Sequence, residues 1–142
     1  MTRLTNQVAL VTGAAGGIGA ATARLFAAEG AAVALLDLPT SAGARVADAI
    51  GAAGGRTHFI PCDVKEEDQV AAAVETIRAD YGRLDILANI AGINRYGRVE
   101  DMPVADWDLM MAVNVRGMFL TIKHSVPLMR AGGGGGIVNL SS

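Results

Sequence analysis

The chain has 142 residues, a length that fits one domain. Its 12 basic and 14 acidic side chains leave a net charge of −2, and no cluster of Lys or Arg forms a basic surface, so we expect no nucleic-acid partner. Hydrophobic residues make up 51% of the chain and charged residues 18%, which excludes an intrinsically disordered protein. The single cysteine, Cys62, excludes an intramolecular disulfide framework and a Cys-rich zinc site, and it favours a reducing, cytoplasmic location.

The longest uncharged stretch covers residues 4–23. It contains Asn6, Gln7, three threonines and four glycines, and this polarity argues against a membrane span of about 20 residues. The apolar run at residues 8–11 is also too short for the hydrophobic region of a signal peptide. We therefore expect no contact with a membrane.

Short apolar runs alternate with helical periods along the chain, which is typical of a parallel sheet with crossover helices. The expected strands are residues 8–11, 32–36, 57–60, 84–88 and 137–140. The first helix follows a glycine-rich turn and ends at Gly30, and the second runs from an N-cap at Thr40 to about residue 53.

Two further helices complete the pattern. The third begins near Glu66, and its expected core face is Val70, Val74, Ile77 and Tyr81. The fourth runs from about residue 104 to residue 130. Its apolar stripe is Val115, Phe119, Ile122, Val126 and Met129.

These elements predict an α/β fold, a doubly wound (Rossmann-like) parallel sheet with strand order 3-2-1-4-5. In this order a ligand crevice lies at the carboxyl ends of strands 1 and 4, where neighbouring crossovers leave in opposite directions. The fifth strand is then an unprotected edge.

A glycine-rich turn joins the first strand to the first helix, with the pattern Thr-Gly-x-x-x-Gly-x-Gly from Thr12 to Gly19. Glycines allow a tight turn and let backbone N–H groups approach a phosphate at the positive end of the helix. The turn is not a P-loop, because no Lys-Ser/Thr pair closes it, and its spacing departs from G-x-G-x-x-G because the last position holds Thr22.

Asp37 follows the second strand, where an acid can bind both hydroxyls of an adenosine ribose. The same carboxylate would repel the 2′-phosphate of NADP, and no Arg or Lys stands at Gly16 or Leu38 to neutralise that phosphate. The cofactor we expect is therefore NAD.

Five motifs in order make the chain resemble the short-chain dehydrogenase/reductase family, in its classical, NAD-preferring branch. They are the loop from Thr12 to Gly19, the pair Asp63-Val64, the segment Asn89-Ile-Ala-Gly92, Asn114 in Asn-Val-Arg-Gly-Met-Phe, and residues 137–142, Ile-Val-Asn-Leu-Ser-Ser. The resemblance implies hydride transfer between NAD and an alcohol or carbonyl substrate, with Ser142 and Asn114 in the catalytic site. It also implies a set of cofactor-binding residues: Thr12, Gly13, Gly17, Ile18, Gly19, Asp37, Asp63, Val64, Asn89, Ala91 and Gly92.

Two features depart from the family pattern. Ile90 replaces the usual second Asn, so any side-chain hydrogen bond at that position is lost. The family's Tyr-x-x-x-Lys segment and C-terminal strands are absent. We therefore expect residues 1–142 to be a single dinucleotide-binding domain, truncated after the fifth strand, that is inactive alone. The alternative is a non-catalytic NAD-binding or dimerising module.

Other interpretations depend on fewer residues. His58 and Cys62 could suggest a metal site or a thiol nucleophile. Two ligands are too few for a zinc site and cysteine is commonly buried, so we expect both to pack in the core and expect no metal. A methyltransferase also places an acid after its second strand, but the acidic residue expected before its glycine loop is missing. The resemblance implies that the long helix pairs with a second copy, in a homodimer or homotetramer. The apolar Met110, Met111, Met118 and Met129 fit such an interface, and core packing explains them nearly as well.

Overall fold

A parallel sheet forms the centre of this computed structural model, which describes residues 2–141. Its five strands within those residues lie in the order β3-β2-β1-β4-β5, so the expected fold class and strand order are confirmed. All four residues of β5 are exposed at the sheet edge, as expected. The strands are β1 (Val8–Thr12), β2 (Ala32–Asp37), β3 (Arg56–Pro61), β4 (Ile86–Asn89) and β5 (Gly136–Asn139).

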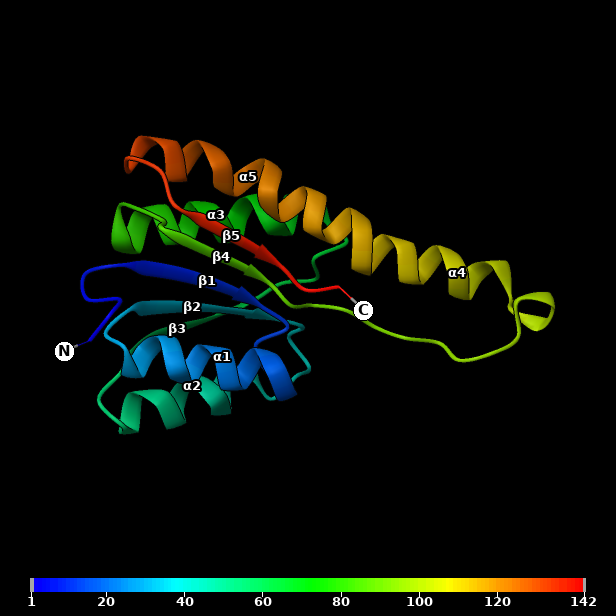
Figure 1. The fold of residues 1–142 in the computed structure, drawn as a ribbon, viewed down its shortest axis with the longest axis horizontal. Coiled ribbons are helices and arrows are strands. Elements are labelled where there is room, and N and C mark those ends of the chain that lie inside the picture. Colours follow the sequence, from blue (N-terminus) through cyan, green and yellow to red (C-terminus); the bar gives the residue numbers. More distant parts are fainter. Residues whose placement is uncertain (1, 142) are drawn as a thin grey trace.

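Helices cover both faces of the sheet, with α1 and α2 on one side and α3 and α5 on the other (Figure 1). The α4–α5 helix runs on past the carboxyl edge of the sheet, and the segment after β4 extends beside it (Figure 1). Within residues 2–141 no helix has the length and apolarity needed to cross a bilayer. The helices are α1 (Gly17–Ala28), α2 (Gly43–Ala52), α3 (Glu67–Tyr81), α4 (Val104–Met111) and α5 (Gly117–Ala131), with a 3₁₀ turn at Val99–Asp101 and a π-helical turn at Ala112–Arg116.

Successive strand residues face opposite helix layers, and this alternation builds two cores. Leu10 and Leu36 pack in the cluster that contains Val70 of α3, whereas Val11 and Leu35 pack in the cluster beneath α1 and α2. These strand residues are fully buried, because a parallel sheet covered on both faces leaves neither side to water.

The second helix begins later than expected, and Thr40 as its N-cap is wrong. The helix starts at Gly43, and the Ser41 hydroxyl accepts a hydrogen bond from the Gly43 N–H at 3.2 Å. Because the turn before the helix extends to Ala42, Ser41 rather than Thr40 lies within reach of the first free N–H groups of the helix.

The apolar stripe expected along the long helix reaches the core only in its second half, where Met129 is buried and Ile122 packs against the core. Val115 and Phe119 are 54% and 59% exposed, whereas Leu120, Thr121 and Ser125 are buried. This helix carries apolar side chains on two faces, so their spacing alone could not indicate which face meets the sheet.

His58 does not pack in the core, which corrects the expectation made for it. It lies on the edge strand β3, where its side chain is exposed and its Nδ1 is 2.6 Å from Asp80 Oδ2. Cys62 is buried as expected, and burial raises the pKa of its thiol to about 11.

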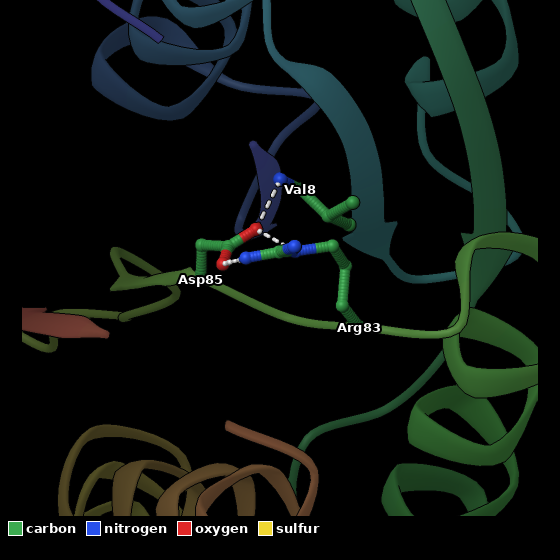
Figure 2. Close-up of polar contacts among 3 residues, drawn as sticks. All are labelled: Val8, Arg83 and Asp85. Carbon is green, nitrogen blue, oxygen red and sulfur yellow. Dashed lines mark hydrogen bonds and ion pairs between the residues drawn. The ribbon is translucent and has the colours of Figure 1, made fainter. Parts of the chain in front are cut away.

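Asp85 joins the amino ends of three strands. Its carboxylate accepts hydrogen bonds from the Val8 N–H at 2.8 Å and from Arg83 Nη2 at 2.6 Å (Figure 2). Its own N–H donates to the Val8 carbonyl, and its carbonyl accepts from the Gly136 N–H. Burial alone would raise the pKa of the Asp85 carboxyl, but the Arg83 and Val8 hydrogen bonds outweigh burial and lower this pKa.

We predict that Asp85→Ala lowers the free energy of unfolding by about 1–3 kcal/mol, because it leaves the buried Val8 N–H without an acceptor. Since the folded-state pKa is lowered, the carboxylate contributes stability above its unfolded pKa of about 3.9, and this contribution disappears as pH falls through the lower folded value.

Urea unfolding at pH 7 and in acid measures both effects. The control is Asp48→Ala on the exposed face of α2, which we expect to change stability by less than about 0.5 kcal/mol. Equal stabilities of the two variants at pH 7 would contradict the role given to Asp85.

Candidate functional site

A crevice of about 660 Å³ opens where the segments that follow β1, β2, β3 and β4 meet. This is the position expected for a ligand in a sheet of this order. Thr12, Gly17, Asn89 and Asn114 lie outside its wall. The residues expected at the site that line it are Gly13, Ile18, Gly19, Asp37, Asp63, Val64, Ala91 and Gly92.

The glycine turn is shaped by close backbone contacts. Gly13 has a φ of +65°, and a Cβ at this position would lie 2.8 Å from the Ala91 Cα. A Cβ at Gly19 would lie 2.0 Å from the Gly13 carbonyl oxygen. A larger residue at Gly13 would therefore push the loop away from the segment after β4, and a larger residue at Gly19 would collide with the turn at Gly13.

The amino end of α1 is open to a ligand. In the described structure no side chain caps this end and its first turn holds no acid. A Cβ at Gly16 or Gly17 would meet nothing within 4 Å, so their small size leaves space at the surface. Unpaired N–H groups and the positive end of the helix dipole fit the pyrophosphate of a dinucleotide.

The Asp37 carboxylate is held in place by the backbone. Its Oδ2 accepts a hydrogen bond from the Ala15 N–H, and its Oδ1 accepts one from the Leu38 N–H, both at 2.8 Å. Each oxygen keeps a further lone pair for a ligand. The side chain is half-buried beside the glycine turn, so its two oxygens form a fixed acceptor pair that could bind a sugar diol.

Thr12 lies behind the crevice and fixes part of its wall. It is 2% exposed, and its hydroxyl accepts hydrogen bonds from the Ile90 and Ala91 N–H groups, each at 3.0 Å. Ile90 therefore takes part through its backbone, and its side chain packs against the core beneath α1. The hydroxyl couples the end of β1 to the turn after β4.

Asn89 connects β4 to β5 and to α5. Its amide Nδ2 donates to Asn139 Oδ1 at 2.8 Å, and its Oδ1 accepts from the Thr121 hydroxyl at 2.6 Å. The Asn89 carbonyl also accepts the Leu140 N–H at 2.9 Å. These contacts fix the position at which the chain leaves β5. The sequence did not predict the role of Thr121, because nothing in its local sequence marks it.

Asn114 sits in the π-helical turn, within the long helix. Its Oδ1 accepts the Ile93 N–H and its Nδ2 donates to the Ile93 carbonyl, both at 2.8 Å. Single π-helical turns occur often at functional sites. Here the turn brings the Asn114 side chain onto the segment after β4, where a Cβ at Gly92 would lie 3.4 Å from Asn114 Oδ1.

The pair Asp63-Val64 lies between β3 and α3. Asp63 holds Lys65 through an ion pair of 2.8 Å, and this contact raises the pKa of Lys65. Val64 packs so closely under α5 that a Cβ at Gly117 would lie 2.9 Å from its Cγ2. Gly117 thus lets the long helix approach this wall of the crevice.

Ser142 lies outside the described residues, so its placement is not part of this structure; the last residue on the crevice wall is Leu140. Residues 2–141 contain no group of three or more His, Cys, Asp or Glu side chains that could hold a metal ion.

A doubly wound sheet with an open helix terminus and an acid after β2 defines a dinucleotide-binding fold. Comparison with known proteins agrees: the family model described as short chain dehydrogenase matches residues 7–142. The chain belongs to the short-chain dehydrogenase family.

Individual relatives are similar over nearly the whole chain. It is 41% identical over 140 residues to D-threitol dehydrogenase of Mycolicibacterium smegmatis, covering 99% of this chain and 54% of that protein. It is 44% identical over 137 residues to cis-4-hydroxycyclohexanecarboxylate dehydrogenase of Sinomonas cyclohexanicum, covering 96% and 55%. The chain thus spans about half the length of these curated relatives.

A solved structure has the same fold. It is a metagenomic short-chain oxidoreductase in complex with NADP, with a TM-score of 0.92 and 39% identity, covering 98% of this chain and 63% of that chain.

We predict that Thr121→Val lowers the free energy of unfolding by about 1–3 kcal/mol, because the buried Asn89 Oδ1 loses its donor while side-chain volume is kept. Thr121→Ser keeps the hydroxyl and should retain most of the stability. Urea unfolding compares them, with Thr76→Val on the exposed face of α3 as the matched control. If Thr121→Val and the control lose the same stability, the bond from Thr121 contributes nothing.

Proposed function

We propose that the whole protein is an oxidoreductase that transfers a hydride between NAD and an alcohol or carbonyl carbon. The observation that supports this most strongly is the Asp37 carboxylate, fixed by two backbone N–H groups beside an open helix terminus. A family of dehydrogenases and a crevice at the carboxyl edge of the sheet agree with it.

The residues of the crevice fit a dinucleotide. Asp37 would bind the adenosine ribose, and the N–H groups at Gly17, Ile18 and Gly19 would bind the pyrophosphate. Asp63 and Val64 would border the adenine, and Ala91 and Gly92 would border the second ribose. Thr12 and Asn89 would not contact the cofactor; they would position the backbone that forms this wall of the crevice. When bound, NAD supplies the hydride acceptor.

Asp37 also supports NAD over NADP. Two unit charges about 4 Å apart cost about 4 kcal/mol at an effective dielectric constant of 20, and Gly16 and Leu38 bring no cation to offset this repulsion. The solved relative in complex with NADP indicates that the fold itself does not exclude NADP. The preference therefore depends on the residues around the ribose.

The catalytic proposal combines residues of two elements. Ser142 would donate a hydrogen bond to the substrate oxygen as charge develops there, and Asn114 would support the segment after β4 while its widened turn frees a backbone carbonyl. The names of the two relatives describe small alcohols, which supports a small alcohol or ketone as substrate.

The exposed face of the long helix supports self-association. Trp107, Met111, Val115 and Phe119 are each at least 40% exposed, and an apolar stripe of this length is typical of an interface. We propose a homodimer or homotetramer formed through this face. The cytoplasmic location, and the assignment of residues 1–142 to one truncated domain, stay predictions that depend on the sequence alone.

Two alternative functions belong to classes of protein other than the oxidoreductases. A methyltransferase is disfavoured by membership of the dehydrogenase family. A non-catalytic NAD-binding or dimerising module would bind the dinucleotide without turnover, and the coding sequence after Ser142 discriminates between the two: a Tyr-x-x-x-Lys segment supports the enzyme.

We predict that Asp37→Ala weakens NADH binding by about tenfold to a hundredfold, because the ribose diol loses a charged acceptor pair. Binding of NADPH should weaken less or strengthen, so the preference for NADH is lost. Fluorescence titration with both cofactors measures this, with Asp48→Ala as the control. An unchanged preference for NADH would show that Asp37 does not select the cofactor.

We also predict that the isolated chain of residues 1–142 binds NADH weakly and reduces no NAD when secondary alcohols are added. Absorbance at the NADH band measures turnover. Alcohol-dependent NADH formation by the purified chain would overturn the expectation that further residues complete the catalytic site.

A further inference from the structure

The crevice has two ends of different chemistry. Asp37 and Asp63 line the end near β2 and β3, whereas Arg95, Leu109 and Val113 line the end near β4. Since the strand order is β3-β2-β1-β4-β5, an adenosine bound at Asp37 leaves the Arg95 end for the reacting part of the cofactor and the substrate.

The side chains of Lys65 and Arg95 bring positive charge to the crevice, and they differ in how closely acids pair with them. The Lys65 ammonium lies 2.8 Å from Asp63 Oδ2 and 3.7 Å from Glu66 Oε1, so its charge is matched. The acid that pairs with Arg95 in residues 2–141 is Asp106, whose Oδ1 lies 3.8 Å from Arg95 Nε without a hydrogen bond. Asp106 does not line the crevice.

The Arg95 guanidinium keeps donors for a ligand. Its Nη1 makes one long contact of 3.4 Å to the Asn94 carbonyl, and its side chain is half-exposed. The backbone two residues earlier is fixed, because the Asn114 amide bonds both the N–H and the carbonyl of Ile93. The guanidinium therefore extends from an anchored point of the loop.

We propose that Arg95 is a specificity-determining residue that binds a carboxylate carried by the substrate. A guanidinium binds a carboxylate through paired hydrogen bonds, and such charge-assisted bonds are stronger than neutral ones. The other side chains at this end, Ile93, Leu109, Val113 and Leu140, are aliphatic and suit a carbon frame. The substrate class is a hydroxy acid or keto acid. This inference rests on the proposed function.

The test uses the whole protein and matched substrates that differ only in charge. The pairs are 3-hydroxybutyrate with 3-hydroxybutyramide, and 4-hydroxycyclohexanecarboxylate with its amide. We expect kcat/KM with NAD to favour the acid by at least about tenfold in one pair. Titration of the NADH-loaded protein with the same compounds, followed by NADH fluorescence, gives a binding readout independent of turnover.

Two variants locate the effect. Arg95→Gln should reduce kcat/KM and affinity for the acid by about tenfold to a hundredfold, and leave the amide and the dissociation constant of NADH within about twofold. Arg95→Lys should restore part of the loss. Arg98→Gln is the matched control, because Arg98 is exposed three residues further along and does not line the crevice; it should change none of these values.

The outcomes separate this inference from the proposed function. Equal use of acids and amides, an equal loss for both in Arg95→Gln, or no use of either pair by a protein that binds NADH would overturn the role of Arg95. A protein that binds neither NADH nor NADPH would instead overturn the proposed function.

Discussion

The Asp37 carboxylate accepts hydrogen bonds from the N–H groups of Ala15 and Leu38; the Ala15 bond joins the glycine turn to the end of β2, and the Leu38 bond fixes the carboxylate against the next residue. They orient a negative charge before any ligand arrives, so no reorganisation is needed when a sugar diol binds. They also place that charge beside the uncapped first turn of α1, where an anion is favoured. In the proposed function this one group would bear on both the binding and the choice of the cofactor.

The rest of the crevice depends on backbone segments that side chains behind it hold in place. Thr12 fixes the turn after β4, Asn114 fixes the next residues of that segment, and Asn89 fixes the end of β5. At the amino ends of the strands, Asp85 aligns β1, β4 and β5 (Figure 2). The shape of the site is therefore set from both ends of β4, and few of the residues that set it would touch a ligand.

The sheet, its order and most candidate site residues could be predicted from the sequence because their signals are local. An apolar run marks each buried strand, as at residues 8–11 within β1, and the glycine turn and Asp37 follow their strands directly. The contacts of Thr121 and Asp85 could not be predicted, since they join residues 32 and 77 positions apart. His58 was misplaced for a related reason: its exposure follows from β3 being an edge strand.

We propose that Asp37 and the first turn of α1 hold a dinucleotide. A crystal structure of the protein with NADH tests it most directly. We expect both ribose hydroxyls of the adenosine within hydrogen-bond distance of the Asp37 carboxylate, and the pyrophosphate against the N–H groups of Gly17 to Gly19. A nucleotide bound elsewhere, or an Asp37 side chain turned away from the adenosine sugar, would contradict it.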